Sequence, residues 1–347
     1  RMKPIRINLF SDTQTQPSVG MRQAMAEADV GDEQQHLDPS VNRLCEEVAI
    51  LLGKEKAMFL PSGTMCNQIA LAVHCVQGDE IIADQTAHIV NNEAAGSAVF
   101  AGAAIRSLAG ERGIFQPEDV EAVLRPGRAL EPRSKLIVVE QTSNGGGGSV
   151  WPLETLKGIA EVARSHGLLM HMDGARLLNA AVASNLLAID FASQVDSVWL
   201  DLSKGLGCPV GAVLAGSDAF IQEAWRWKHR MGGAMRQAGI LAAAGSWALA
   251  NNIERLAEDH HNASRFSQSI DSVQGIKIMN PDAETNLVFF DIEETGMQAK
   301  KLVAQLREHG VWIGANGRFR LRAVTHLGID QSAVDEASEL IANLLHR

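Results

Sequence analysis

Two apolar segments, each followed by an ionisable residue, constrain the fold and the chemistry of this chain most strongly. Residues 168–172 end in the lone carboxylate of Asp173, and residues 197–202 lead into Ser203 and Lys204. Such runs are typical of buried strands in a parallel sheet, and α/β proteins bind ligands at the carboxyl edge of that sheet. We therefore expect an acid and an amine to meet at one edge.

An acid beside a lysine is the pair of groups that pyridoxal phosphate requires. The acid keeps the ring nitrogen of this cofactor protonated, and the lysine forms the covalent link to its aldehyde carbon. The sequence therefore predicts a pyridoxal phosphate site at Asp173 and Lys204.

Length and charge narrow the possible partners. With 347 residues and 46% hydrophobic content, the chain exceeds the usual size of one compact unit, so we expect two domains. A net charge of −10 and the lack of a basic block argue against nucleic acid and anionic membranes. Small molecules are the expected partners.

The cysteines and the apolar segments predict a cytoplasmic protein. The four cysteines are scattered, with no CxxC spacing, so we expect reduced thiols and no metal site. No apolar stretch reaches the length of a membrane span, and residues 1–4 are too polar for the core of a signal peptide.

The alternation of strand-like and helix-like segments predicts an α/β fold with a mostly parallel central sheet and helices around it. We expect an N-terminal arm over residues 1–17, a large domain over 18–248 and a small α+β domain over 249–347. Residues 211–215 would form a strand turned back against its neighbour. One long Ala-rich helix, from residue 240 to residue 260, would bridge the domains.

The segment Ser62-Gly63-Thr64 lies between an apolar strand and a helix. Free amides and the dipole at a helix start form a natural phosphate-binding site, although an ordinary strand-to-helix turn would have the same sequence.

His88 follows another predicted strand, where its ring could stack on a planar ligand or remain solvated in a loop. The four glycines after Asn144 fit either a close approach to a ligand or a flexible loop.

Seven motifs, in one order along nearly the whole chain, resemble those of the low-specificity L-threonine aldolases, which are fold-type I pyridoxal phosphate enzymes close to the β-eliminating lyases. The motifs are Ser11-Asp12-Thr13, Ser62-Gly63-Thr64, Ala87-His88, Asp173-Gly174-Ala175-Arg176, Leu202-Ser203-Lys204-Gly205-Leu206-Gly207, Gly232-Gly233-Ala234-Met235-Arg236-Gln237 and Arg322-Ala323-Val324-Thr325-His326-Leu327.

This resemblance implies a role for each matching residue. Lys204 would carry the cofactor, Asp173 would bind its ring nitrogen and His88 would cover its ring. Gly63 and Thr64 would bind the phosphate, with Arg236 reaching it across a subunit interface. Arg176 and Arg322 would clamp the substrate carboxylate in bidentate geometry, and Ser11 would line the same pocket. Without the resemblance, Arg176 could simply pair with a nearby acid, and Arg322 could be a surface residue.

Two loops depart from the family pattern. The family has a Tyr where this chain, which has no Tyr, reads Asp32-Glu33-Gln34-Gln35-His36-Leu37-Asp38-Pro39. The His of a Thr-His-Asn-Gly stretch, often assigned to the substrate hydroxyl, is replaced here by Ser143. We hypothesise that His36 or His88 acts as the base, and that the preferred β-substituent differs from a methyl group.

The expected reaction is the retro-aldol cleavage of a β-hydroxy-α-amino acid, with L-threonine or L-allo-threonine giving glycine and acetaldehyde. A β-elimination or a transamination on the same cofactor is the second possibility, and a non-catalytic pyridoxal phosphate binder is the third. The resemblance also implies a homodimer or homotetramer with shared active sites.

Overall fold

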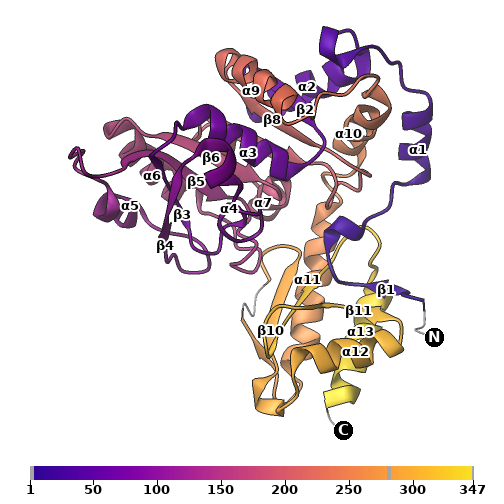
Figure 1. The fold of residues 1–347 in the computed structure, drawn as a ribbon. Helices are drawn as coiled ribbons and strands as arrows, with labels where there is room; N and C mark the ends of the chain where they lie inside the picture. Colours follow the sequence, from indigo (N-terminus) through magenta and orange to yellow (C-terminus); the bar gives the residue numbers. More distant parts are fainter. Residues whose placement is uncertain (1–3, 280–282, 346–347) are drawn as a thin grey trace.

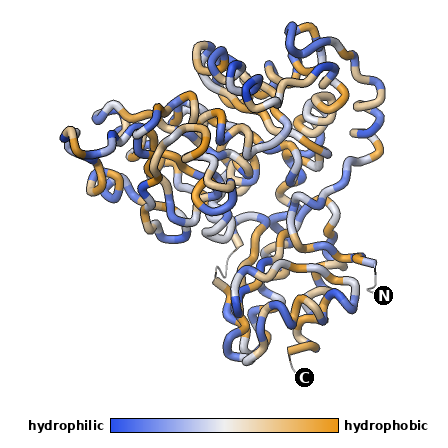
Figure 2. Tube along the Cα trace, viewed as in Figure 1, coloured by the Kyte–Doolittle hydropathy of each residue, from blue (hydrophilic) through white to orange (hydrophobic). Residues whose placement is uncertain are grey.

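The computed structural model describes residues 4–279 and 283–345. The larger part of the chain is built on a seven-stranded sheet and the C-terminal part on a four-stranded sheet (Figure 1). Hydrophobic stretches run through both parts, and hydrophilic stretches alternate with them along the chain (Figure 2). None of the described helices combines the length and the apolar character needed to cross a membrane.

The seven-stranded sheet is mostly parallel, as predicted. Its strands, in spatial order, are β2 (Lys56–Leu60), β8 (Ala212–Gly216), β7 (Ser197–Asp201), β6 (Leu169–Gly174), β5 (Arg133–Glu140), β3 (Asp79–Asp84) and β4 (Ala104–Leu108). The strands from β7 to β4 are parallel to one another, whereas β8 pairs antiparallel with both of its neighbours. The predicted reversal of residues 211–215 is therefore confirmed.

Helices cover both faces of this sheet because successive strand residues point to opposite sides. In β3, Ile81 packs in the core on one face and Ile82 in the core on the other. The first face carries α3 (Gly63–His74), α4 (His88–Asn91) and α9 (Asp218–Arg230), and the second carries α2 (Pro39–Leu52), α5 (Pro117–Val123), α6 (Leu153–Ser165), α8 (Ala188–Ala192) and α10 (Gly239–Asn251). Helix α7 (Leu177–Ser184) follows β6, and its Leu177 and Leu178 pack in the core of the second face.

Helix α2 begins and ends where its sequence predicts. The Asp38 side chain accepts a hydrogen bond from the amide of Val41 at 3.0 Å, and Pro39 occupies the first turn. Gly53 follows the helix with a φ of 62°, a left-handed conformation that suits glycine.

The C-terminal part has its own core. Its four strands, all antiparallel, are β12 (Gly314–Ala315), β13 (Arg320–Val324), β10 (Leu287–Asp291) and β9 (Lys277–Ile278), and its helices are α11 (Leu256–Asp271), α12 (Ala299–Glu308) and α13 (Gln331–Leu345). Phe266 of α11 and Phe290 of β10 are fully buried here, with their ring centroids 6.2 Å apart. An aromatic pair of this kind stabilises the core beyond the free energy gained from burying its apolar area.

The N-terminal arm crosses from one part to the other. Its strand β1 (Ile7–Asn8) pairs in parallel with β11 (Val311–Trp312), and Phe10 stacks on Trp312 with ring centroids 4.1 Å apart. The chain then runs through a short 3₁₀ turn, Asp12–Gln14, to α1 (Val19–Ala26), which packs on α10. The arm therefore passes between the two cores (Figure 1).

The prediction of one long helix from residue 240 to residue 260 is wrong, because the segment forms two helices, α10 and α11. Between them, the Asn252 side chain donates a hydrogen bond to the carbonyl oxygen of Leu206 at 2.7 Å. Ala244 and Ala248 of α10 pack in the larger core, whereas Ala263 and Phe266 of α11 pack in the smaller one. The domain boundaries proposed from the sequence stay a prediction.

A buried ion pair joins the turn before α2 to α9. The side chains of Glu33 and Lys228 are both fully buried, and Lys228 Nζ lies 2.8 Å from Glu33 Oε1 and 2.8 Å from the carbonyl oxygen of Phe59. Such pairs contribute little net stability, but removing one partner leaves an unpaired charge in the interior.

We therefore expect Lys228→Met to lower the free energy of unfolding by about 3–5 kcal/mol, because Glu33 loses its cation. Arg226→Met is the matched control on the same helix, because the Arg226–Glu223 pair is exposed and contributes little. Urea unfolding of both variants checks this, and equal losses in the two would contradict it.

Candidate active site

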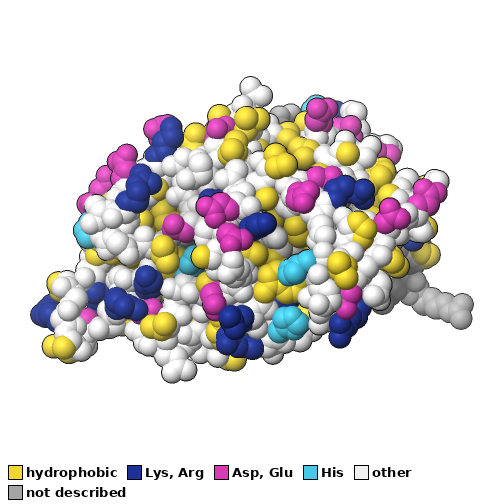
Figure 3. Space-filling model, turned by 90° about the horizontal axis from the view of Figure 1, so that it is seen from above, with side chains coloured by type: hydrophobic (Ala, Val, Ile, Leu, Met, Phe, Trp, Pro, Cys, Tyr) yellow, Lys and Arg dark blue, Asp and Glu magenta, His cyan; other side chains and the backbone are white. Residues whose placement is uncertain are grey.

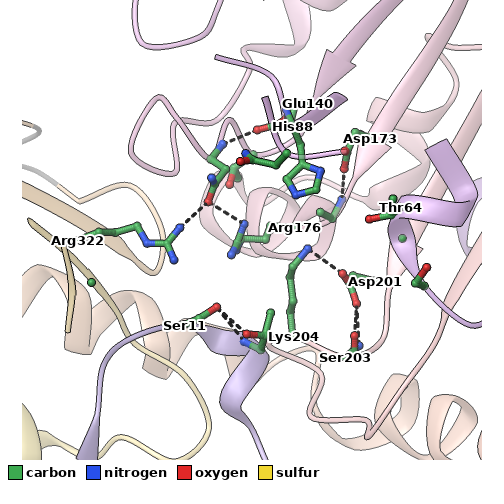
Figure 4. A pocket seen from close by; sticks show the side chains of 18 of the residues that line it. Ser11, Thr64, His88, Glu140, Asp173, Arg176, Asp201, Ser203, Lys204 and Arg322 are labelled. Carbon is green, nitrogen blue, oxygen red and sulfur yellow. Dashed lines mark hydrogen bonds and ion pairs between the residues drawn. The ribbon is translucent and has the colours of Figure 1, made fainter. Parts of the chain in front are cut away.

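A cavity of about 580 Å³ opens where β5, β6 and β7 end, beside the N-terminal arm and β13. Eight of the residues singled out from the sequence line it: Ser11, Gly63, Thr64, His88, Asp173, Arg176, Lys204 and Arg322. Figure 4 labels all of them except Gly63. The parallel strands bring these residues together because their carboxyl ends share one edge of the sheet.

Strand register places the acidic groups side by side. Glu140 of β5 pairs with Asp173 of β6, which in turn pairs with Trp199 of β7. Glu140 accepts hydrogen bonds from the amides of His88 and Asn144, both at 2.7 Å. The edge therefore carries two neighbouring buried carboxylates.

Asp173 is a buried acid without a cationic partner. Its side chain accepts a hydrogen bond from Asn67 Nδ2 at 2.8 Å and another from the amide of Ala175 at 3.1 Å. Burial raises its pKa, against the opposing effects of the Lys204 charge and the Asn67 hydrogen bond. No ion pair within residues 4–279 and 283–345 includes Asp173, so a cation bound in the cavity would offset the burial of this charge.

Lys204 projects its amine into the same cavity. Lys204 Nζ lies 2.7 Å from Asp201 Oδ2 and 5.6 Å from the centroid of the Trp199 ring. The other oxygen of Asp201 accepts hydrogen bonds from the amide and the hydroxyl of Ser203, at 2.8 and 2.9 Å. Thr15 of the arm donates to the Lys204 carbonyl oxygen at 2.9 Å and so fixes the backbone that carries the amine.

The start of α3 forms the wall opposite the arm. Ser62 caps the helix by accepting a hydrogen bond from the amide of Met65 at 3.2 Å. The amides of the first helical residues, Gly63 and Thr64, have no intrahelical acceptor, and both residues line the cavity. A Cβ on Gly63 would lie 2.1 Å from the Trp199 ring, so only glycine fits this close approach.

The two arginines of the cavity differ in their partners. Arg176 forms a bidentate pair with Asp12 of the arm, with Nε–Oδ2 and Nη2–Oδ1 distances of 2.7 and 2.8 Å. Arg322 donates to Asn144 Oδ1 at 3.2 Å and to the carbonyl oxygen of Phe10 at 3.3 Å. Burial, with the charge of Arg176, lowers the pKa of Arg322. Within the described part of the chain, Arg322 has no carboxylate partner.

This pairing changes the roles expected of the two arginines. Burial alone would raise the pKa of Asp12, but the Arg176 charge holds that pKa well below its usual range. The guanidinium of Arg176 therefore has one edge committed to an acid of the chain, while Arg322 keeps a charge available for an anion. The alternative of a surface Arg322 is wrong, because this side chain lines the cavity.

His88 lines the same cavity as Asp173. Its Nδ1 lies 2.8 Å from Glu93 Oε1, and this hydrogen bond raises the pKa of His88. Its other ring nitrogen has no hydrogen-bond partner among the residues that the structure describes. The imidazole is thus oriented by Glu93, with Nε2 left for a ligand.

These groups fit pyridoxal phosphate. A buried carboxylate without a cation, Asp173, suits a protonated ring nitrogen, and the first amides of α3 suit a phosphate. Lys204 lies in the same cavity as both. The donor set thus matches the aldehyde, the ring nitrogen and the phosphate of the cofactor.

Three residues singled out from the sequence do not line this cavity. His36 is exposed and packs edge-on against Trp225, with ring centroids 5.0 Å apart. Arg236 is exposed and pairs with Asp32 at 2.9 Å. Ser143 is buried behind the wall, where its Oγ accepts a hydrogen bond from the amide of Gly146 at 3.2 Å. Their predicted roles stay predictions.

Several residues that complete the wall were assigned no role from the sequence. Glu140, Asn144 and Asp201 line the cavity directly, and Asp12, Asn67 and Glu93 hold the residues that do. Glu140 and Asp201 follow the same rule that pointed to Asp173, since each ends a central strand. Asn67 and Glu93 carry no comparable signal because neither lies at the end of a strand.

Comparison with known proteins agrees with this geometry. A model of the β-eliminating lyase family matches residues 8–295. The chain belongs to the β-eliminating lyase family. Among its relatives, a low-specificity L-threonine aldolase of Escherichia coli K12 is 40% identical over 333 residues, covering 96% of this chain and 97% of the relative. Low-specificity L-threonine aldolase 1 of Arabidopsis thaliana is 38% identical, covering 94% and 93%. The predicted resemblance is confirmed.

Solved structures support the fold of this β-eliminating lyase family member. A threonine aldolase of Leishmania major superposes with a TM-score of 0.83 at 20% identity, covering 98% of this chain and 99% of that one. An L-allo-threonine aldolase candidate of Listeria monocytogenes gives a TM-score of 0.80 at 21% identity, covering 98% and 96%. The predicted fold class is therefore confirmed.

The buried Glu140 makes stability depend on pH. Burial, together with the charge of Asp173, raises the pKa of Glu140 from 4.5 to about 7. Because the pKa of Glu140 is higher in the folded than in the unfolded state, the contribution of Glu140 to stability is fully present below about pH 4.5. That contribution is lost as pH rises through about 7.

We therefore expect the protein without cofactor to lose stability between pH 5 and pH 8 more steeply than its Glu140→Gln variant. Urea unfolding of both proteins across this range measures the difference in slope. Parallel pH profiles would contradict the account of Glu140.

Proposed function

We propose that this chain is a pyridoxal phosphate-dependent aldehyde-lyase that cleaves a β-hydroxy-α-amino acid to glycine and an aldehyde. One observation carries the proposal. Asp173, Lys204 and the first residues of α3 line the same cavity as Arg322, which has no carboxylate partner in the described chain. The names of the relatives add the substrate class, with L-threonine and L-allo-threonine as the first candidates.

Bound pyridoxal phosphate supplies an electron sink for the pair left when a bond to the substrate α-carbon breaks. Groups that line the cavity would hold the cofactor and keep its ring nitrogen protonated. Asp173 holds a proton on the ring nitrogen, and the amides of Gly63 and Thr64 bind the phosphate. Lys204 provides the amine for the aldehyde carbon.

The substrate binds through its carboxylate to Arg322, whose planar guanidinium matches a carboxylate. Arg176 adds positive potential from beside it, although its bidentate partner is Asp12. Asn144 accepts hydrogen bonds from both arginines, at 3.5 and 3.2 Å, and so fixes their spacing. A carboxylate held here sets which bond of the α-carbon faces the cofactor.

His88 is the proposed base for the β-hydroxyl proton. It lines the cavity, and Glu93 orients its ring. His36 lies outside the cavity of its own chain, so it could act only in the cavity of a second copy. Ser143 would affect the substrate through the loop it braces, because its hydroxyl is bound to the Gly146 amide.

We also propose a cytoplasmic homodimer or homotetramer with shared active sites. All four cysteines are free, which suits a reducing compartment. Large hydrophobic side chains of α1, the turn before α2, α2 and α10 are exposed, namely Val19, Leu37, Ile50 and Ile240. The face seen from above shows hydrophobic side chains among charges of both signs (Figure 3).

A panel of β-hydroxy-α-amino acids tests the reaction. We expect the holoenzyme to release glycine and an aldehyde in equal amounts, identified by chromatography and mass spectrometry. A keto acid with ammonia would instead indicate β-elimination, and a keto acid with a transferred amine would indicate transamination. A bound cofactor without any turnover would contradict an enzymatic role.

We expect Arg322→Gln to raise the KM for the amino acid about 10- to 100-fold, because a hydrogen-bonded charge pair with the substrate carboxylate is lost. Arg320→Gln is the matched control on β13. Arg320 pairs with Asp291 and does not line the cavity, so its KM should stay within about twofold of wild type. Equal effects in the two variants would contradict the assignment of Arg322.

A further inference from the structure

Asn67 of α3 is fully buried behind the cavity, and its amide group makes four hydrogen bonds. Nδ2 donates to Asp173 Oδ2 at 2.8 Å and to Glu93 Oε1 at 2.7 Å. Oδ1 accepts from Trp199 Nε1 at 2.7 Å and lies 3.1 Å from His171 Nε2. The Asn67 side chain thus contacts Asp173, Glu93 and Trp199, which lie in three different segments of the chain.

The orientation of this amide is fixed by its neighbours. An indole nitrogen only donates, so the atom facing Trp199 must be the amide oxygen. Burial lowers the pKa of His171 to about 3, so its ring is neutral, and Nε2 must carry the proton that faces Oδ1. The other nitrogen, Nδ1, then accepts from Ser197 Oγ at 2.8 Å. Both amide protons are therefore directed at carboxylates.

Those two carboxylates would serve different parts of the cofactor. Asp173 would hold the ring nitrogen, and Glu93 orients His88, which would cover the ring. A single NH₂ group thus fixes the distance between the acid at the ring nitrogen and the imidazole beside it. It also offsets the repulsion of two buried negative charges by donating to both.

The oxygen side of Asn67 fixes a third element. The Trp199 ring fills the space that a side chain at position 63 would need, and Lys204 Nζ lies 5.6 Å from its centroid. By accepting the indole proton, Asn67 fixes this ring between the phosphate-binding turn and the lysine.

We propose that Asn67 is the positioning residue that aligns Asp173, the Glu93–His88 pair and Trp199 with bound pyridoxal phosphate. This inference rests on the proposed cofactor, but not on the retro-aldol reaction. It assigns no contact between Asn67 and the substrate, and it concerns the state of the cofactor rather than the chemical step.

The charged and titratable groups around this amide are few. They are Asp173, Glu93 and His171 in direct contact, and His74, His88, Glu140, Asp201 and Lys204 further out. Loss of the amide donors destabilises the ionised form of Asp173 relative to its protonated form, because Asp173 has no cationic partner within the described chain. Asp173 would then hold the proton of the ring nitrogen less firmly.

The test compares Asn67→Ala with wild-type holoenzyme in two measurements besides turnover. We expect the dissociation constant for pyridoxal phosphate to rise about 10- to 100-fold, as for a lost hydrogen bond to a charged group. We also expect a lower pKa for the ring nitrogen of the bound cofactor, measured as a lower midpoint when its visible absorbance is titrated with pH. Asn262→Ala is the matched control, since Asn262 is a buried amide that donates to the carbonyl oxygen of Ile329 in the C-terminal part.

A purely structural role would lower the unfolding temperature of Asn67→Ala, as in the control, and leave the absorbance midpoint unchanged. That result would overturn the proposal. If Asn67→Ala does not fold, Asn67→Asp keeps the shape and the oxygen facing Trp199 while removing the amide donors, and the same two measurements decide. Failure of wild type to release an aldehyde would contradict the proposed reaction alone, because binding and absorbance do not depend on it.

Discussion

The burial of the Asp173 carboxylate is the constraint on which the rest of the site depends. A charge this deep in the sheet edge is costly unless donors and a cation surround it. The chain supplies the donors, from Asn67 and the Ala175 amide, but the described residues supply no cation in direct contact. A positively charged ligand group would complete the arrangement, and the protonated ring nitrogen of pyridoxal phosphate would provide one.

The other charges of the cavity are largely matched in pairs. Asp12 neutralises Arg176, Asp201 faces Lys204, and Glu93 faces His88. Asp173 and Arg322 have no ionic partner in the described chain, and neither has Glu140, whose carboxylate accepts hydrogen bonds from two backbone amides. Asp173 suits the cation of the cofactor, and Arg322 suits the carboxylate of an amino acid. This division of charge would let a single cavity hold both molecules in a fixed orientation.

Much of this arrangement could be predicted from the sequence because strand ends carry a local signal. An apolar run followed by an acid identifies Asp173, and a Gly turn before a helix identifies Gly63. The fold class follows from the alternation of strands and helices. The break at Asn252 could not be predicted, because continuous Ala-rich periodicity conceals the fact that its two halves pack in different cores. Asn67 gave no signal either, since its importance depends on contacts with Asp173, Glu93 and Trp199 that are distant in sequence.

The central claim is that Lys204 carries pyridoxal phosphate in the cavity next to Asp173. Borohydride reduction of the holoenzyme, followed by proteolysis and mass spectrometry, tests it most directly. The account predicts a phosphopyridoxyl group on the peptide that contains Lys204, and its absence from that peptide in a Lys204→Ala variant. An adduct on another lysine of the wild-type protein, or no adduct at all, would contradict it.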